Sequence, residues 1–153
     1  MCSSDLDMIA ASAVVWKLKS VSAINSVVGT RIYPGRAPQG ATLPYICVDR
    51  PPGQVPLAKS SQGQGSLRKT PVTVFCFGDQ STGGIKQAGE LVELVRTNIC
   101  PASGVTGSVQ WNGTWIDHCT DNGSYEHIEN PQDGGEVGWR AMAIDIDVFH
   151  LNC

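Results

Sequence analysis

The segment from Arg31 to Val48 constrains the fold more than any other part of the chain. It reads RIYPGRAPQGATLPYICV, so that three prolines and two glycines interrupt short apolar stretches. Proline fixes its own φ and disfavours a helical conformation in the residue before it. The backbone must therefore run extended, turn and run on before a strand begins at Tyr45. Because the segment has no nucleophile beside a base and no cluster of metal ligands, we predict an architectural role for it.

The composition predicts one domain whose surface is suited to being covered by another protein. A chain of 153 residues buries roughly 70% of its unfolded surface. Charged residues make up 16% of it, against roughly 25% in an ordinary soluble domain. The net charge is −3 and the Lys and Arg residues are scattered, so no basic stripe indicates nucleic-acid binding. We expect a single domain over residues 1–153, with flexible loops at about 50–70 and 121–138.

The N-terminal sequence and the cysteines show no sign of export. The chain begins MCSSDLD, which is acidic where a secretory signal is basic, and no apolar run approaches the roughly 18 residues of a membrane span. We therefore expect a soluble protein made in the cytoplasm, with no membrane partner and no cofactor. None of the six cysteines belongs to a Cys-x-x-Cys pair, which favours reduced, buried thiols over a zinc site.

Two helices are predicted in the N-terminal part. The first helix is predicted over residues 5–18, with Ser3 or Ser4 as its candidate N-cap. Their apolar side chains lie on two opposite faces, which predicts two buried contacts for this helix. A shorter helix over residues 22–28 ends at Gly29, a residue suited to a helix C-terminus.

Residues 85–99 form the clearest predicted helix. Ser81 or Thr82 is a candidate cap before it, and Pro101 ends it. Its apolar residues share an arc of roughly 120° on a helical wheel and predict packing on a sheet: Ile85, Ala88, Leu91, Val92, Val95 and Ile99.

Alternating or continuous apolar runs predict the strands, with a hairpin turn at Asn112-Gly113, where both residues favour the positive φ of a type I′ turn. The segment 72–77 is apolar on both faces, as expected in the middle of a covered sheet. The runs lie at residues 44–49, 72–77, 105–111, 114–120 and 139–151. The predicted fold class is α+β, an antiparallel sheet of four to five strands with two main helices packed on one face.

No set of residues predicts a catalytic or metal site. Asp145 and Asp147 point to one face of the last strand and His150 to the other, so they do not form a carboxylate and histidine site. The carboxylates are expected to be a solvated or subunit-facing strip. Cys119 and His118 are adjacent in a strand and face apart, which excludes a nucleophile and base pair.

Two further features have alternative interpretations. Gly83-Gly84 lacks the Gly-Lys-Ser/Thr ending of a phosphate-binding loop, so the start of a capped helix is favoured. Trp111 and Trp115 flank the predicted turn and are either exposed anchors or packed sheet residues.

The segment from Tyr33 to Ile46, YPGRAPQGATLPYI, resembles the part by which small tail-completion or tail-terminator proteins of long-tailed bacteriophages are recognised. The order around it agrees with the resemblance. An N-terminal helix and the lead-in at residues 28–33 precede the segment. A Val-rich strand at 72–77, the amphipathic helix at 85–99 and a final strand containing Asp147 follow it.

The resemblance implies a non-enzymatic virion protein, assembled in the host cytoplasm and located at the head-proximal end of the tail. It implies a homo-oligomeric ring of six copies that stops tail-tube polymerisation and mediates head–tail joining. The implied partners are the tail tube protein and the head–tail connector or neck protein, without sequence-specific nucleic-acid binding. The alternatives are a neck or head–tail adaptor ring, a small ligand-binding module, or an enzyme that uses His118 or His150.

Within this hypothesis, residues are assigned to two kinds of contact. The loop at 54–69 and the Asn112-Gly113 hairpin are expected to reach an axial partner. Within that loop, Arg68 and Lys69 either meet acidic groups of the partner or only solubilise the loop. The expected subunit-interface residues are Ala10, Val14, Val15, Arg36, Pro38, Asp145 and Asp147. The expected axial-partner residues are Arg68, Lys69, Trp111, Asn112 and Gly113.

Overall fold

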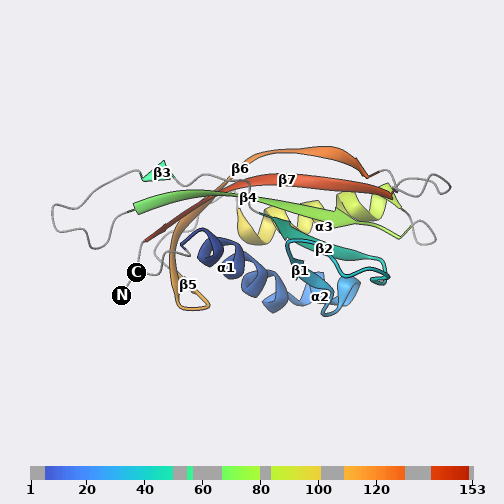
Figure 1. Ribbon diagram of the computed structural model, residues 1–153, viewed down its shortest axis with the longest axis horizontal. Coiled ribbons are helices and arrows are strands. Elements are labelled where there is room, and N and C mark those ends of the chain that lie inside the picture. The colour runs from blue at the N-terminus through green and yellow to red at the C-terminus, as the bar shows by residue number, and fades with distance from the viewer. Residues whose placement is uncertain are drawn as a thin grey trace.

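The structure, a computed structural model, describes residues 6–49, 55–56, 67–79, 84–100, 109–129 and 139–151. These residues form a mixed α+β fold in which the helices cover one face of a curled sheet (Figure 1). The helices are α1 (Leu6–Ser20), α2 (Ser22–Val28) and α3 (Ile85–Ile99). The strands are β1 (Ile32–Pro34), β2 (Tyr45–Asp49), β3 (Val55–Pro56), β4 (Leu67–Phe77), β5 (Val109–Trp111), β6 (Thr114–Glu129) and β7 (Trp139–Leu151).

The sheet is larger than predicted and is not wholly antiparallel. Its strand order is β1-β2-β4-β7-β6-β5, and the short β3 also pairs with β4, so the described residues form seven strands instead of four to five. The added strands β1 and β3 have three and two residues, too few to produce a periodic pattern. In addition, β1 pairs with β2 in parallel, while the other pairs are antiparallel.

Two strands extend further than predicted. β4 begins at Leu67, so Arg68 and Lys69 lie in a strand and not in a loop. Pro71 lies within β4, between the stretch paired with β3 and the stretch paired with β2. Neither β2 nor β3 pairs with β4 at Pro71, so on that side of β4 no partner strand requires the backbone N–H that proline lacks.

β6 continues through Asp121 to Glu129, where a loop was predicted. Residues 121–126 are exposed and polar, so no apolar alternation marks them. Backbone pairing with β7 holds this stretch, with register shifts between Ile116 and His118 and between Asp121 and Ser124.

Other predicted boundaries are confirmed. α2 spans Ser22–Val28 before Gly29, α3 spans Ile85–Ile99, and β7 spans Trp139–Leu151. The predicted turn has positive φ at both positions, 53° at Asn112 and 81° at Gly113. The N-cap residue of α3 is Gly84, which makes no side-chain cap hydrogen bond, and not the predicted Ser81 or Thr82. Those two residues and the terminator Pro101 lie outside the described residues, as do most of the loop at 50–66 and residues 130–138.

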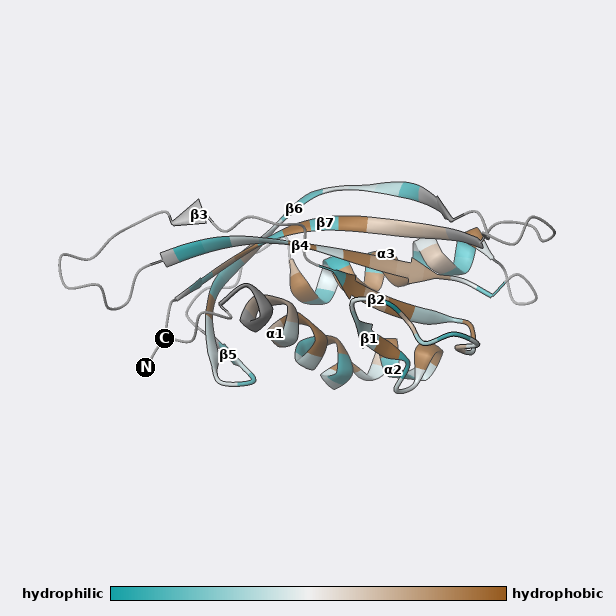
Figure 2. Cartoon of the chain, viewed as in Figure 1, coloured by the Kyte–Doolittle hydropathy of each residue, from teal (hydrophilic) through white to brown (hydrophobic). Residues whose placement is uncertain are grey.

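The main core lies between the helices and the sheet. Alternate residues of β4 and β7 point toward the helices, and Figure 2 shows the apolar middle of both strands above α3. The face of α3 predicted from periodicity is buried there, apart from the exposed Ile85. The core members on β2, β4 and β7 are Ile46, Val48, Val72, Val74, Cys76, Ile144, Ile146 and Val148. No helix among the described residues is long and apolar enough to cross a membrane.

Candidate functional site

The proline-rich segment forms an arm, residues 35–44, that connects the parallel strands β1 and β2 across the sheet face opposite the helices. Backbone hydrogen bonds hold both ends of it. The Gly35 N–H donates to the Val48 carbonyl at 2.8 Å, and the Ile46 N–H donates to the Arg31 carbonyl at 3.0 Å. The Arg31 side chain also donates from Nε to the Pro44 carbonyl at 2.9 Å. The arm is therefore a fixed part of the fold.

The arm packs on a second, smaller apolar cluster. Its residues Ala37, Ala41 and Leu43 lie against buried side chains of β2, β4 and β7. Positive φ angles of 78° at Gly35 and 79° at Gly40 turn the chain at two points of the arm, and glycine adopts such angles without a steric penalty. The buried members of the cluster are Tyr45, Cys47, Phe77 and Ala141.

A row of aromatic rings crosses three strands beneath the arm. Tyr33 and Tyr45 meet edge to face with ring centroids 5.9 Å apart. Tyr45 and Phe77, which are paired across β2 and β4, have centroids 4.7 Å apart. Both separations are within the range of favourable aromatic pairs. The row makes a rigid apolar floor.

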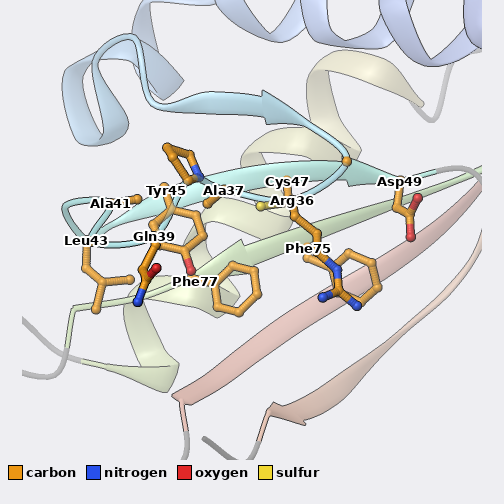
Figure 3. A pocket seen from close by; sticks show the side chains of 13 residues that line it. Arg36, Ala37, Gln39, Ala41, Leu43, Tyr45, Cys47, Asp49, Phe75 and Phe77 are labelled. Carbon is orange, nitrogen blue, oxygen red and sulfur yellow. The ribbon is translucent and has the colours of Figure 1, made fainter. Parts of the chain in front are cut away.

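A pocket of about 710 Å³ opens between the arm and this floor. We call it the arm pocket. Figure 3 shows Leu43, Tyr45 and Phe77 gathered at one end and Arg36, Phe75 and Asp49 at the other. Its size lies within the range of sites that bury most of a small ligand's surface. The lining is formed by residues 35–41, Leu43, Tyr45, Cys47, Asp49, Phe75 and Phe77.

Charge is confined to the rim of the arm pocket. Arg36 is exposed, and no described residue forms a hydrogen bond or an ion pair with it. The other charged lining residue is Asp49, which is also exposed. An apolar floor with a cation at its edge is suited to an apolar group that carries a carboxylate nearby.

The two carboxylates of β7 lie on the same sheet face as the arm and are bound by their own chain. Asp145 accepts a hydrogen bond from Thr73 Oγ1 at 2.8 Å. Asp147 accepts one from Asn122 Nδ2 at 2.6 Å, and Lys69 Nζ lies 3.6 Å away. Their assignment to a subunit interface stays a prediction.

The exposed Tyr125 on β6 extends this polar cluster. Although Tyr125 is largely exposed, the partial loss of solvent around its hydroxyl, followed by the charge and hydrogen bond of Asp145, raises the pKa of Tyr125 above its usual value.

The imidazoles of His118 and His150 lie as the strand pattern predicts. His150 is fully buried on the helix side and its Nε2 is 2.7 Å from Thr70 Oγ1, so it faces away from Asp145 and Asp147. His118 stacks on Phe149 with ring centroids 4.1 Å apart. Within the described residues, no group of three His, Cys, Asp or Glu side chains is placed to hold a metal ion.

The four cysteines in the described part of the chain form no disulfide bond. Cys47 and Cys76 are buried, and Cys100 and Cys119 are half-buried. A thiol–thiol hydrogen bond with Cys100 that favours the protonated form of Cys119, followed by burial, raises the pKa of Cys119, and burial raises that of Cys76. A raised pKa keeps each of these groups protonated and unreactive.

The remaining predicted interface residues are divided between core and surface. Ala10, Val14 and Val15 are buried in the core of their own subunit, and Trp16 is the large apolar residue that α1 exposes. Arg36 and Pro38 lie exposed on the arm. The assignment of these residues to subunit contacts stays a prediction.

The residues assigned to axial partners also differ in exposure. Asn112 and Gly113 form the exposed tip of the hairpin. Trp111 is buried in the core, as the packed-sheet interpretation expects, while Trp115 is 43% exposed, and a role of Trp115 as an anchor stays a prediction. Arg68 and Lys69 are half-buried on β4.

The arm pocket was not predicted, although the sequence carries a signal for it. The second face of β4 carries Phe75 and Phe77, and nothing predicted would have covered them. The arm carries its own apolar residues, Ala37, Ala41 and Leu43, between the prolines. Two apolar sets without partners are expected to meet.

Comparisons with known proteins agree with this architecture. A family model described as "Tail completion protein gp17" matches residues 12–123, more than half of the chain. The fold is similar to a chain in a structure titled "Virion of native gene transfer agent (GTA) particle". The TM-score is 0.67 at 12% identity, over 97% of this chain and 99% of that one. At this identity the likeness shows a shared fold. A comparison with curated protein sequences finds no match.

Proposed function

We propose that this chain, which belongs to the tail completion protein gp17 family, forms a six-membered ring at the head-proximal end of a phage tail tube. It is a structural tail-completion protein of a phage-like virion. In the proposed ring it stops polymerisation of the tube and presents a surface for head joining. The family match over residues 12–123 is the observation that carries the proposal. The chain that shares its fold comes from a virion particle, which supports it.

The subunit has the asymmetry that a ring requires. Neighbours in a cyclic ring meet head to tail, so each subunit needs two different, complementary surfaces. The described sheet ends in two different edges, the arm-bearing β1 edge and the β5–β6 hairpin edge. Large apolar side chains also remain exposed away from the arm, on α1 (Trp16) and on β6 (Trp115). These surfaces supply the unlike contacts.

We assign the contacts within the ring accordingly. Arg36 and Pro38 on the arm, with Trp16 on α1, meet neighbouring subunits. The hairpin tip at Asn112 and Gly113 projects toward an axial partner, either the tube or the connector. Arg68 and Lys69 on β4 provide positive charge toward acidic groups of such a partner. In this scheme the protein acts by binding alone and performs no chemistry.

The oligomeric state of the purified chain tests the ring directly. Light scattering is expected to give six times the 16.3 kDa of one subunit, and electron microscopy is expected to show rings. With the tail tube protein of the same virion, the rings should cap one end of each tube. A chain that stays monomeric at high concentration and does not bind tubes would refute the proposal.

A genetic experiment separates the proposed position from its alternative. Phage without this gene should accumulate unjoined heads together with tails of uncontrolled length, and a plasmid copy should restore infectious particles. Tails of normal length that merely fail to join heads would place the ring in the neck instead. Labelled protein found on heads and absent from tube ends would support the same correction.

A further inference from the structure

We propose that Trp115 of one subunit inserts into the arm pocket of the next subunit, and that Asp117 pairs there with the neighbour's Arg36. The inference rests on the ring proposed above and specifies how its subunits meet. The occupant of the pocket is thus a second copy of this chain, presented by the outer side of β6 beside its hairpin turn.

Trp115 is placed as an anchor. It lies two residues after the Asn112-Gly113 turn, opposite Gln110 of β5. The next residue, Ile116, is fully buried in the core, so Trp115 points to the other side of the strand. Its side chain is 43% exposed although its strand is rigidly paired. Tryptophan is one of the three residue types in which interface hot spots are enriched.

The arm pocket has the matching shape and chemistry. Its floor carries the rings of Tyr45, Phe75 and Phe77, which offer faces and edges to an indole, and Tyr33 packs edge to face against Tyr45. Its volume of about 710 Å³ leaves room for a tryptophan side chain together with part of the strand that carries it. The arm above is held at both ends by hydrogen bonds, so little ordering entropy is lost when the pocket fills.

Complementary charge selects a second copy as the occupant. Arg36 stands exposed at the pocket rim, without a hydrogen bond or ion pair to any described residue. Asp117 follows Trp115 by two residues, and its side chain is 48% exposed. It contacts His118 Nδ1 at 2.5 Å, which leaves carboxylate lone pairs for a guanidinium. An indole and a carboxylate two residues apart thus face an apolar pocket whose rim carries Arg36 together with Asp49, which already has an interaction of its own within the chain.

The sheet topology makes the contact intermolecular. The arm belongs to the β1–β2 edge, whereas Trp115 belongs to the β5–β6 edge, with β4 and β7 between them (Figure 1). A subunit therefore presents the anchor and the pocket at opposite edges of one sheet. Head-to-tail repetition of such a contact closes into a ring when the rotation matches.

Single substitutions in the full chain test the anchor and the pocket separately. Trp115→Ala and Arg36→Asp are each expected to weaken subunit association by about 30-fold or more, as for truncation of an interface hot spot. Sedimentation velocity measures the change, and circular dichroism checks folding. Ile85→Ala is the control, since Ile85 is also a large exposed apolar residue, at 36%, but lies on α3, to which no subunit contact is assigned. It should leave association unchanged.

Mixing the variants gives the decisive result. Trp115→Ala retains the pocket and Arg36→Asp retains the anchor, so a mixture has one intact combination and should form one-to-one dimers that cannot grow. Combining Arg36→Asp with Asp117→Arg in one chain should restore rings. Ala41→Trp is designed to fill the pocket with its own side chain. If this variant folds, its subunit association should be weakened as in Arg36→Asp.

Two other outcomes distinguish this inference from the ring itself. Normal rings from both Trp115→Ala and Arg36→Asp would refute the docking and leave the ring in place. A wild-type chain that remains monomeric would refute the ring, and the docking with it.

Discussion

Gly78→Ala is expected to destabilise the protein strongly, because the chain folds back on itself at this residue. Gly78 joins β4 to the segment that leads into α3. A Cβ atom added there would lie 2.0 Å from the Gly84 carbonyl oxygen and 2.9 Å from its carbonyl carbon. Real Cβ contacts of this kind essentially never fall below 3.0 Å. Since the obstructing atoms are backbone, no side-chain rotation relieves the clash.

The expected loss in the free energy of unfolding has two contributions, the steric clash itself and the loss of one hydrogen bond of α3. Overpacking of this kind costs about 1–3 kcal/mol. The Gly84 carbonyl also accepts the first hydrogen bond of α3, from the Ala88 N–H at 3.1 Å, and losing that bond adds about 1 kcal/mol. The free energy of unfolding should therefore fall by about 2–4 kcal/mol. For a chain of this length, the melting temperature should fall by about 4–16 °C.

Gly89→Ala is the matched control, with the same chemical change and the opposite sign. Gly89 lies inside α3, and nothing occupies the space within 4 Å of its Cβ position. Alanine there should stabilise the helix by about 1 kcal/mol. Thermal and urea unfolding followed by circular dichroism measure both variants. If Gly78→Ala proves as stable as wild type, the close approach of β4 and α3 described above is incorrect.

The remaining predictions concern titratable groups. Because the pKa of Tyr125 is raised in the folded state, its contribution to stability is fully present below the ordinary tyrosine pKa and is lost as pH rises through the folded-state value. The absorbance titration of Tyr125, taken as the difference between wild type and Tyr125→Phe, should lie above the ordinary tyrosine range, and Asp145→Asn should bring it earlier; an unchanged titration of Tyr125 in the Asp145→Asn variant would contradict the assignment. Cys76 and Cys119, whose pKa values are raised, should react with iodoacetamide only after unfolding, as read by peptide mass spectrometry. Rapid modification of either thiol in the native protein would be the contrary result.

The parts of the fold that were predictable are those where local pattern and tertiary structure agree. α3 and β7 carry apolar residues at the period of their own geometry, so their bounds were predicted from sequence. The hairpin turn followed from the φ preference of Asn112 and Gly113. The residues of β6 beyond Asp121 were missed because backbone pairing with β7, and not side-chain burial, makes them a strand.

The candidate site was less accessible to prediction because it depends on a pairing between distant segments. The arm was recognised as a fixed extended path, but the short parallel strand β1 that begins it has three residues and no pattern. Without β1, nothing placed the arm over Phe75 and Phe77. Likewise, the exposure of Trp115 and the burial of Trp111 depend on which side of the β5–β6 hairpin meets α1 and the core. Sequence alone left both interpretations open.

The arm also explains why this sheet face retains a pocket. A connection between parallel strands usually needs a dozen or more residues, and a helix within it covers the sheet. Here the connection has only the ten residues 35–44, and three prolines in or beside it prevent a helix. The arm therefore covers the sheet incompletely, and Phe75 stays half-buried beside Arg36 at the open end. Since prolines also restrict the arm before association, a neighbour that fills the gap gains apolar contact while losing little chain entropy. A short, proline-stiffened crossover thus favours assembly over stability of the isolated subunit.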